Sequence, residues 1–137
     1  MPAATAALTG ALGETAFQQY FLQQGCFVAA PVYDLWKTDF VIEWEGRLNK
    51  VNVKTMSKAP NAYHVQLQTG GAVRRRLYRE GEIDYFGVVN LEYEKIWMIP
   101  LADVKGRTLI SWIPPERRKN KLSCLLYTSP SPRDRVQ

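Results

Sequence analysis

The sequence predicts an α/β fold, and three observations support this prediction. Apolar residues recur at helical spacing over residues 6–24, where Phe17 and Phe21 lie four residues apart. Residues 38–57 are typical of two strands joined by a tight turn. Residues 83–91 form a strongly apolar segment of strand length. With 137 residues, the chain is long enough for one domain with a hydrophobic core.

The first expected element is the helix over residues 6–24, which Gly25 is well suited to end. The apolar stripe of this helix predicts that Glu14 faces the core, an unusual environment for a carboxylate. The neighbouring Gly13 has no side chain, so backbone or a ligand can come close at this point. A strand over residues 26–32 is expected next, followed by a loop.

A hairpin is expected around the dipeptide Glu45-Gly46, because glycine readily adopts the positive φ of a two-residue turn. A turn at this place sets Asp39 opposite Asn52. Side chains alternate between faces along a strand, so Lys54 shares the face of Asn52 and Asp39. The opposite face is apolar and carries Phe40, Ile42, Trp44, Val51 and Val53.

The rest of the chain predicts further strands. Residues 63–68 alternate between apolar and polar side chains, whereas the arginine-rich residues 73–82 have no clear pattern. The remaining expected elements are strands over 83–91, 95–99 and 108–113, with a single helical turn over 101–105.

Composition narrows the functional classes. The chain carries 18 Lys and Arg against 13 Asp and Glu, a net charge of +5, which favours a polyanionic partner. It contains neither an apolar run of membrane-spanning length nor a signal peptide, so no membrane association and a cytoplasmic location are expected. The two cysteines, Cys26 and Cys124, have no metal-ligand spacing and predict no disulfide framework.

The polar face of the hairpin suggests a chemistry. A carboxylate, an amide oxygen and an ammonium group together suit metal-assisted attack on a phosphodiester. The simpler interpretation is that Asp39 and Lys54 form only a cross-strand ion pair on a solvated face. Likewise, Glu14 could be an ordinary helix-surface residue.

The order of these motifs resembles the PD-(D/E)XK nuclease superfamily, and within it the branch of group I intron-associated homing endonucleases and Holliday-junction-resolvase-like proteins. The likeness spans about residues 12–112. It rests on Gly13-Glu14, Thr38-Asp39-Phe40-Val41, Val51-Asn52-Val53-Lys54-Thr55, the segment from Ile83 to Phe86, and Met98-Ile99-Pro100. The resemblance implies a mixed central β-sheet flanked by helices, with a restriction-endonuclease-like core.

The resemblance also implies roles for single residues. Asp39 would bind Mg²⁺, or alternatively Mn²⁺, together with Asn52, the Val53 carbonyl and Glu14. Lys54 would position or activate the attacking water. Asn52 departs from the superfamily's Asp or Glu and from the Gln frequent in this branch. Because an Asn carbonyl is neutral, this departure points to weaker metal binding or lost activity.

The expected function is a metal-dependent endodeoxyribonuclease that acts on double-stranded DNA. A homo-oligomer, a dimer or tetramer, is expected if both strands are cut. The alternatives are a junction resolvase, a DNA-binding module without catalysis, and a structural interaction domain. The candidate DNA-binding residues are Lys37, Lys58, Arg74, Arg75 and Arg76, although the three consecutive arginines could equally form a solvated loop.

The tail of the chain differs in kind from the rest. Residues 124–134 resemble the conceptual translation of a sequencing-library adapter. We therefore expect a single nuclease-like domain over residues 1–122, and an artefactual, disordered tail over 123–137 with no role in function.

Overall fold

The computed structural model describes residues 2–33, 36–70 and 73–118. The predicted tail therefore lies outside the described residues. The secondary-structure elements are α1 (Pro2–Gln23), β1 (Val28–Ala29), β2 (Phe40–Trp44), β3 (Arg47–Thr55), β4 (Ser57–Lys58), β5 (Tyr63–Gln66), β6 (Gln68–Thr69), β7 (Arg76–Leu77), β8 (Tyr85–Asn90), β9 (Lys95–Pro100), the 3₁₀ turn η1 (Leu101–Val104), β10 (Leu109–Trp112) and the 3₁₀ turn η2 (Pro115–Arg117).

The central sheet is mixed and has the strand order β1-β2-β3-β8-β9. Its β3 and β8 run parallel, whereas the other neighbours run antiparallel. The predicted hairpin register is confirmed, because Phe40 pairs with Val51 and Trp44 with Arg47. Both turn residues have positive φ, 54° at Glu45 and 80° at Gly46, which is the type I′ geometry of two-residue hairpins. The ladder begins at the pair of Phe40 and Val51, and Asp39, whose amide donates to the Val51 carbonyl, lies just outside it.

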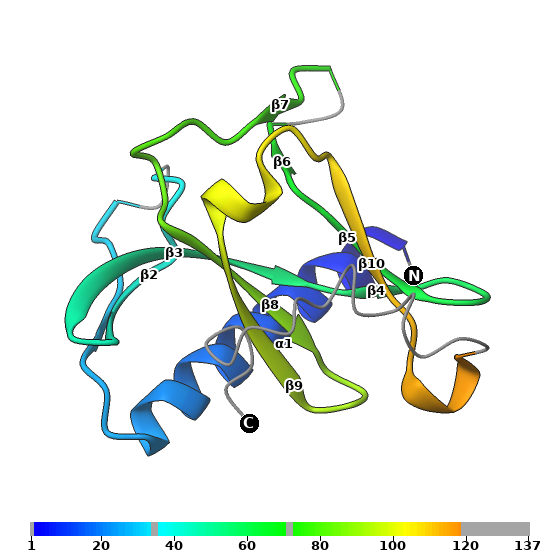
Figure 1. Ribbon diagram of the computed structural model, residues 1–137, viewed down its shortest axis with the longest axis horizontal. Coiled ribbons are helices and arrows are strands. Elements are labelled where there is room, and N and C mark those ends of the chain that lie inside the picture. The colour runs from blue at the N-terminus through cyan, green and yellow to red at the C-terminus, as the bar shows by residue number, and fades with distance from the viewer. Residues whose placement is uncertain (1, 34–35, 71–72, 119–137) are drawn as a thin grey trace.

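Helix α1 packs across one face of the central sheet, as Figure 1 shows. Phe17 and Phe21 are buried there against Phe40 and Val51, and burial of one such side chain contributes about 1.5–3 kcal/mol. The helix can come this close because of a glycine. A Cβ on Gly87 would lie 2.4 Å from the Phe17 ring.

The helix ends as the sequence predicts. Gly25 has a φ of +79°, its amide donates to the Leu22 carbonyl, and the Cys26 amide donates to the Phe21 carbonyl. These two hydrogen bonds form a Schellman motif, which satisfies carbonyls that a helix end would otherwise leave unpaired.

The other face of the central sheet is covered by a second sheet of order β10-β5-β4. A large core lies between the two sheets and includes Tyr63 and Val65 from β5, Trp112 from β10, and Phe86 and Trp97 from the central sheet. The α/β class with a mixed central sheet is confirmed. In the described residues, one α-helix, α1, flanks the central sheet on one face, and the layer on the other face is a sheet.

Two further differences concern the edges of the fold. The strand expected over residues 26–32 is shorter and covers only Val28–Ala29, although the Phe27 carbonyl also accepts a hydrogen bond from the Glu43 amide. Beyond it, Pro31 has no amide hydrogen to donate to a ladder. On α1, Leu12 lies outside the core and is 49% exposed. No helix in the described part of the chain is both long and apolar enough to cross a membrane.

The contact between α1 and β3 predicts opposite effects for two glycines of the same helix. A Cβ on Gly13 would lie 1.8 Å from Thr55 Oγ1 and 3.0 Å from its Cβ, whereas a Cβ on Gly10 would meet no atom within 4 Å. Gly10→Ala should stabilise the protein by about 0.5–1 kcal/mol, because alanine is the better helix former. Gly13→Ala should destabilise it by about 1–3 kcal/mol through overpacking. Urea denaturation measures both, and equal effects of the two substitutions would contradict the close contact.

Candidate active site

The carboxylate of Asp39 lies where β2 begins. The Asp39 amide donates to the Val51 carbonyl at 2.8 Å. Two residues further along β3, the Val53 amide donates to Asp39 Oδ2 at 2.7 Å. The side chain of Asp39 thus occupies the position that the next backbone hydrogen bond of the ladder would take, and the hydrogen bond fixes its carboxylate at the edge of β3.

The same edge exposes a backbone oxygen. The ladder between β2 and β3 starts at Phe40 and Val51, so β2 does not cover β3 beyond this pair. In an antiparallel ladder the N–H and C=O of one residue point to the same side of the strand. Because the Val53 amide points toward Asp39, the Val53 carbonyl points to the same open edge. A carboxylate and a carbonyl are therefore presented next to each other.

Lys54 follows Val53 and its side chain is directed to the opposite face of β3. Its Nζ donates to the Gln68 carbonyl of β6 at 3.3 Å and lies 5.0 Å from the centre of the Tyr78 ring. A cation near an aromatic face is attracted by the ring quadrupole. The ribbon of β6 and β7 and the segment after it therefore hold this ammonium group in place.

Two carboxyl groups have raised pKa values. Partial burial raises the pKa of Asp39, although the hydrogen bond from Val53 and the charge of Lys54 act in the opposite direction. Glu14 is exposed as a whole residue, but burial of its carboxyl group and repulsion by Asp39 raise its pKa. The sequence predicted that Glu14 faces the core, but the residue lies at the rim of the site. Its carboxylate is close enough to Asp39 for the two charges to interact.

Asn52 is the buried member of the group, with 8% of its surface exposed. Its Nδ2 donates to the Lys37 carbonyl at 2.7 Å, which ties β3 to the loop before Asp39. Its Oδ1 is buried and has no hydrogen-bond partner among the described residues. A buried acceptor without a partner is costly and is commonly explained by a ligand, an ion or a water molecule.

The described ranges contain no group of three or more His, Cys, Asp or Glu side chains that could hold a metal ion. A metal at this edge would therefore need a mixed set of oxygens. The oxygens that the sequence analysis predicted for this purpose are the carboxylates of Glu14 and Asp39, the amide oxygen of Asn52 and the Val53 carbonyl. Hard cations such as Mg²⁺ bind oxygens of these kinds.

The predicted DNA-binding residues differ in their surroundings. Arg74 and Arg75 are exposed. Arg76 instead forms a bidentate ion pair with Glu82, with distances of 2.9 and 2.8 Å. Lys58 lies 3.6 Å from Glu92, in a pair whose side chains are both 56% exposed.

Several contacts that position the site were not predicted from the sequence. Tyr78 and the Gln68 carbonyl contact Lys54, and Thr38 Oγ1 donates to the Glu82 carbonyl at 3.1 Å. Residues 73–82 gave no periodic signal because β7 pairs only over Arg76–Leu77. No sequence pattern therefore indicated these contacts.

The raised pKa of Asp39 predicts a pH-dependent effect on stability. A carboxyl group whose pKa is higher in the folded state than in the unfolded state costs stability as the pH rises through the folded value. Asp39→Asn retains an oxygen for the Val53 amide and removes the charge. The variant should therefore have a higher melting temperature than wild type at neutral pH, and the difference should shrink on acidification. Calorimetry over a pH series measures this.

The matched control is Glu43→Gln, which changes an exposed carboxylate on the same strand. We expect its effect to stay within about 0.5 kcal/mol at each pH. A lower melting temperature of Asp39→Asn than of wild type at neutral pH would contradict the assigned environment of Asp39.

Known proteins resemble this chain in sequence and in fold. Residues 5–124 match the PD-(D/E)XK endonuclease family. Protein 5.3 of Escherichia phage T7 is 33% identical over 108 residues, which cover 74% of this chain and 85% of that protein. The structure of the bacterial homing endonuclease I-Ssp6803I superposes with a TM-score of 0.75 at 25% identity, covering 88% of this chain and 86% of that one. The chain therefore belongs to the PD-(D/E)XK endonuclease family.

Proposed function

We propose that this protein is a metal-dependent endodeoxyribonuclease that hydrolyses phosphodiester bonds in double-stranded DNA. The observation that carries the proposal is the Asp39 carboxylate, which the Val53 amide fixes at an open strand edge close to Lys54 and Glu14. Membership of an endonuclease family and likeness to a homing endonuclease support it.

The proposed metal ligands are Asp39, Asn52, the Val53 carbonyl and Glu14. The unpaired Oδ1 of Asn52 and the all-oxygen donor set fit Mg²⁺ or Mn²⁺. When bound, such an ion supplies Lewis-acid polarisation of the phosphodiester. The raised pKa values of Asp39 and Glu14 also fit, because a cation would offset the repulsion between two partly buried carboxylates.

The proposed role of Lys54 is to hold the attacking water and to stabilise charge on the phosphate. The contact with the Gln68 carbonyl uses one of its three donors, which leaves two for water or a phosphate oxygen. The Tyr78 ring restricts where the ammonium can go. A donor fixed in advance stabilises developing charge without reorganisation at the moment of reaction.

The proposed phosphate contacts are made by basic residues around this edge. Arg76 forms an ion pair with Glu82, and the charge of Lys58 is partly neutralised by Glu92. Of the five candidates, we therefore favour Lys37, Arg74 and Arg75 for contacts with phosphate. Such contacts release counterions, so the affinity for DNA should fall steeply with salt. The described residues of one chain provide one such centre, so we propose that a homo-oligomer, a dimer or tetramer, is needed to cut both strands.

A second candidate function is a DNA-binding module without catalysis. Asn52 favours it, because a neutral amide stands where the family has an acid or Gln. Its Nδ2 is also engaged with the Lys37 carbonyl, so the side chain already has a structural role.

Purified protein should nick or cut supercoiled plasmid DNA in Mg²⁺ or Mn²⁺, and Asp39→Ala and Lys54→Ala should each lower the rate by about 100-fold or more. Glu43→Ala, an exposed acid on β2, should leave the rate unchanged. Gel electrophoresis of the topological forms measures the rates. Cleavage by either variant at the wild-type rate would show that the site is assigned wrongly.

The same assay separates the two candidate functions through Asn52. Asn52→Glu adds a negative charge and Asn52→Gln lengthens the side chain, and both changes should strengthen metal binding. Both variants should therefore cut faster and need a lower Mg²⁺ concentration for half of their maximal rate. If the wild-type protein binds DNA without cutting it, whereas Asn52→Glu cuts it, the protein is a DNA-binding module without catalysis. An unchanged metal dependence in both variants would exclude Asn52 as a ligand.

A further inference from the structure

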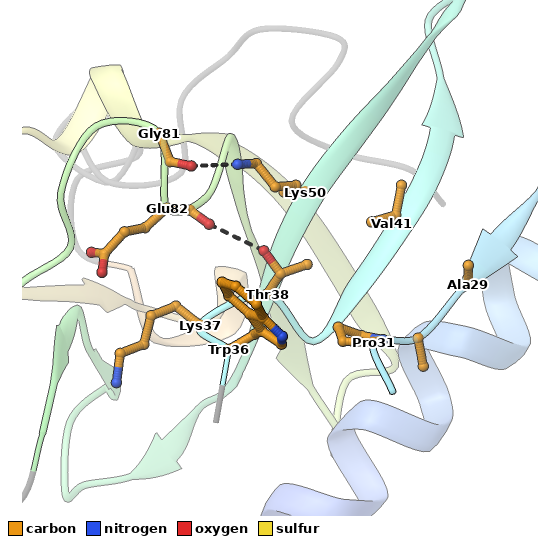
Figure 2. Close-up of a pocket in the computed structure, with 10 residues that line it drawn as sticks. Ala29, Pro31, Trp36, Lys37, Thr38, Val41, Lys50, Gly81 and Glu82 are labelled. Atoms are coloured by element: carbon orange, nitrogen blue, oxygen red, sulfur yellow. Dashed lines mark hydrogen bonds between the residues drawn. The ribbon is translucent and has the colours of Figure 1, made fainter. Parts of the chain in front are cut away.

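A surface pocket of about 550 Å³ lies beside the candidate active site, and Figure 2 shows its lining. Its volume falls within the range of about 300–1,000 Å³ that is usual for small-ligand sites. Pro31, Val41 and Ala29 supply an apolar wall, and the other side is formed by Lys50, Gly81 and Glu82.

The wall opposite the apolar side is fixed by hydrogen bonds. Lys50 Nζ donates to the Gly81 carbonyl, and Thr38 Oγ1 donates to the Glu82 carbonyl, as drawn in Figure 2. The Lys50 amide also donates to Asp84 Oδ2 at 2.8 Å. These contacts tie β3 to residues 81–84, so this side of the pocket is preorganised.

The charges around the pocket favour an anionic ligand. The hydrogen bonds from Arg76 hold the pKa of Glu82 at about 2, and its charge is balanced by that guanidinium group. Lys37 and Lys50 carry positive charges and form no ion pair among the described residues. The two lysines therefore leave the pocket with an excess of positive charge.

An exposed aromatic side chain belongs to the same pocket. Trp36 is 65% exposed, although a side chain of this kind is usually well buried. Tyr33, which is 57% exposed, packs edge-on against it with ring centres 6.4 Å apart. The exposed indole combined with two lysines is the chemistry that binds unpaired bases, by stacking on the base and attracting its phosphate.

The pocket is continuous with the candidate active site along β3. Lys50, Asn52 and Lys54 share one face of this strand, so Lys50 lies about 7 Å from Asn52 and about 13 Å from Lys54. Lys37 joins the two sites directly, since it lines the pocket and its carbonyl accepts the hydrogen bond from Asn52. With about 3.4 Å per nucleotide along one strand, these distances correspond to roughly two to four nucleotides.

We propose that the Trp36 pocket is a subsite for an unpaired nucleobase, and that the preferred substrate is DNA with an unpaired nucleotide about two to four nucleotides from the scissile phosphate. This inference rests on the proposed nuclease function for the position of the cut. A paired base does not present its face to an indole, so the subsite selects a nucleotide that has left the stack.

The test measures binding without cleavage, in EDTA, so it does not depend on catalysis. Two duplexes of the same sequence are compared by fluorescence anisotropy, one fully paired and one with a single unpaired nucleotide. Wild type should bind the second at least about fivefold more tightly, the lower limit for one stacked base. Trp36→Ala should lose this preference and keep its affinity for the paired duplex. Trp36→Phe should retain part of it.

The matched control is Phe27→Ala, which removes another exposed aromatic side chain outside the pocket. It should leave the preference unchanged. A photocrosslink from 5-iododeoxyuridine at the unpaired position should map to Trp36 or Tyr33. Equal affinity of wild type for both duplexes, a preference that survives Trp36→Ala, or a crosslink elsewhere would overturn the proposal. Discrimination by a protein that never cleaves would support the subsite and refute the nuclease function.

Discussion

The hydrogen bond from the Val53 amide to the Asp39 carboxylate is the interaction on which the candidate active site depends. A backbone amide at a strand edge needs an acceptor, and here an aspartate side chain supplies it instead of another residue of β2. This replacement fixes the carboxylate while leaving the Val53 carbonyl open at the same edge. β2 therefore positions the Asp39 carboxylate at its start and also leaves this edge of β3 uncovered.

The two layers around the central sheet bring the remaining groups to this edge. On one face, Gly13 lets α1 approach Thr55, and the next residue, Glu14, reaches the neighbourhood of Asp39. On the other face, residues after β5 supply the Gln68 carbonyl and the Tyr78 ring to Lys54. This arrangement costs stability, because the two partly buried carboxylates of Asp39 and Glu14 repel each other. Such a conflict between stability and function is usual in catalytic centres.

The sequence was most informative where geometry is local. A two-residue turn determines strand register, so the pairing of Phe40 with Val51 and of Trp44 with Arg47 followed from Glu45-Gly46 alone. Two strands of the layer opposite α1, β5 and β10, were predicted, but β4 was not, because a strand of two residues is too short to show a period. The ion pair between Arg76 and Glu82 was also missed, since nothing in a sequence tells which arginine of a run will find a carboxylate.

Placement of a metal at the open edge of β3 is the central claim, and paramagnetic broadening of backbone amide signals by substoichiometric Mn²⁺ tests it most directly. The measurement reports position and does not require activity. If a metal binds at this edge, the signals of Val53 and Asp39 should broaden first, followed by those of Glu14 and Asn52, and Asp39→Asn should remove the effect. Broadening centred on other acidic residues, such as Asp103 or Glu80, would contradict it.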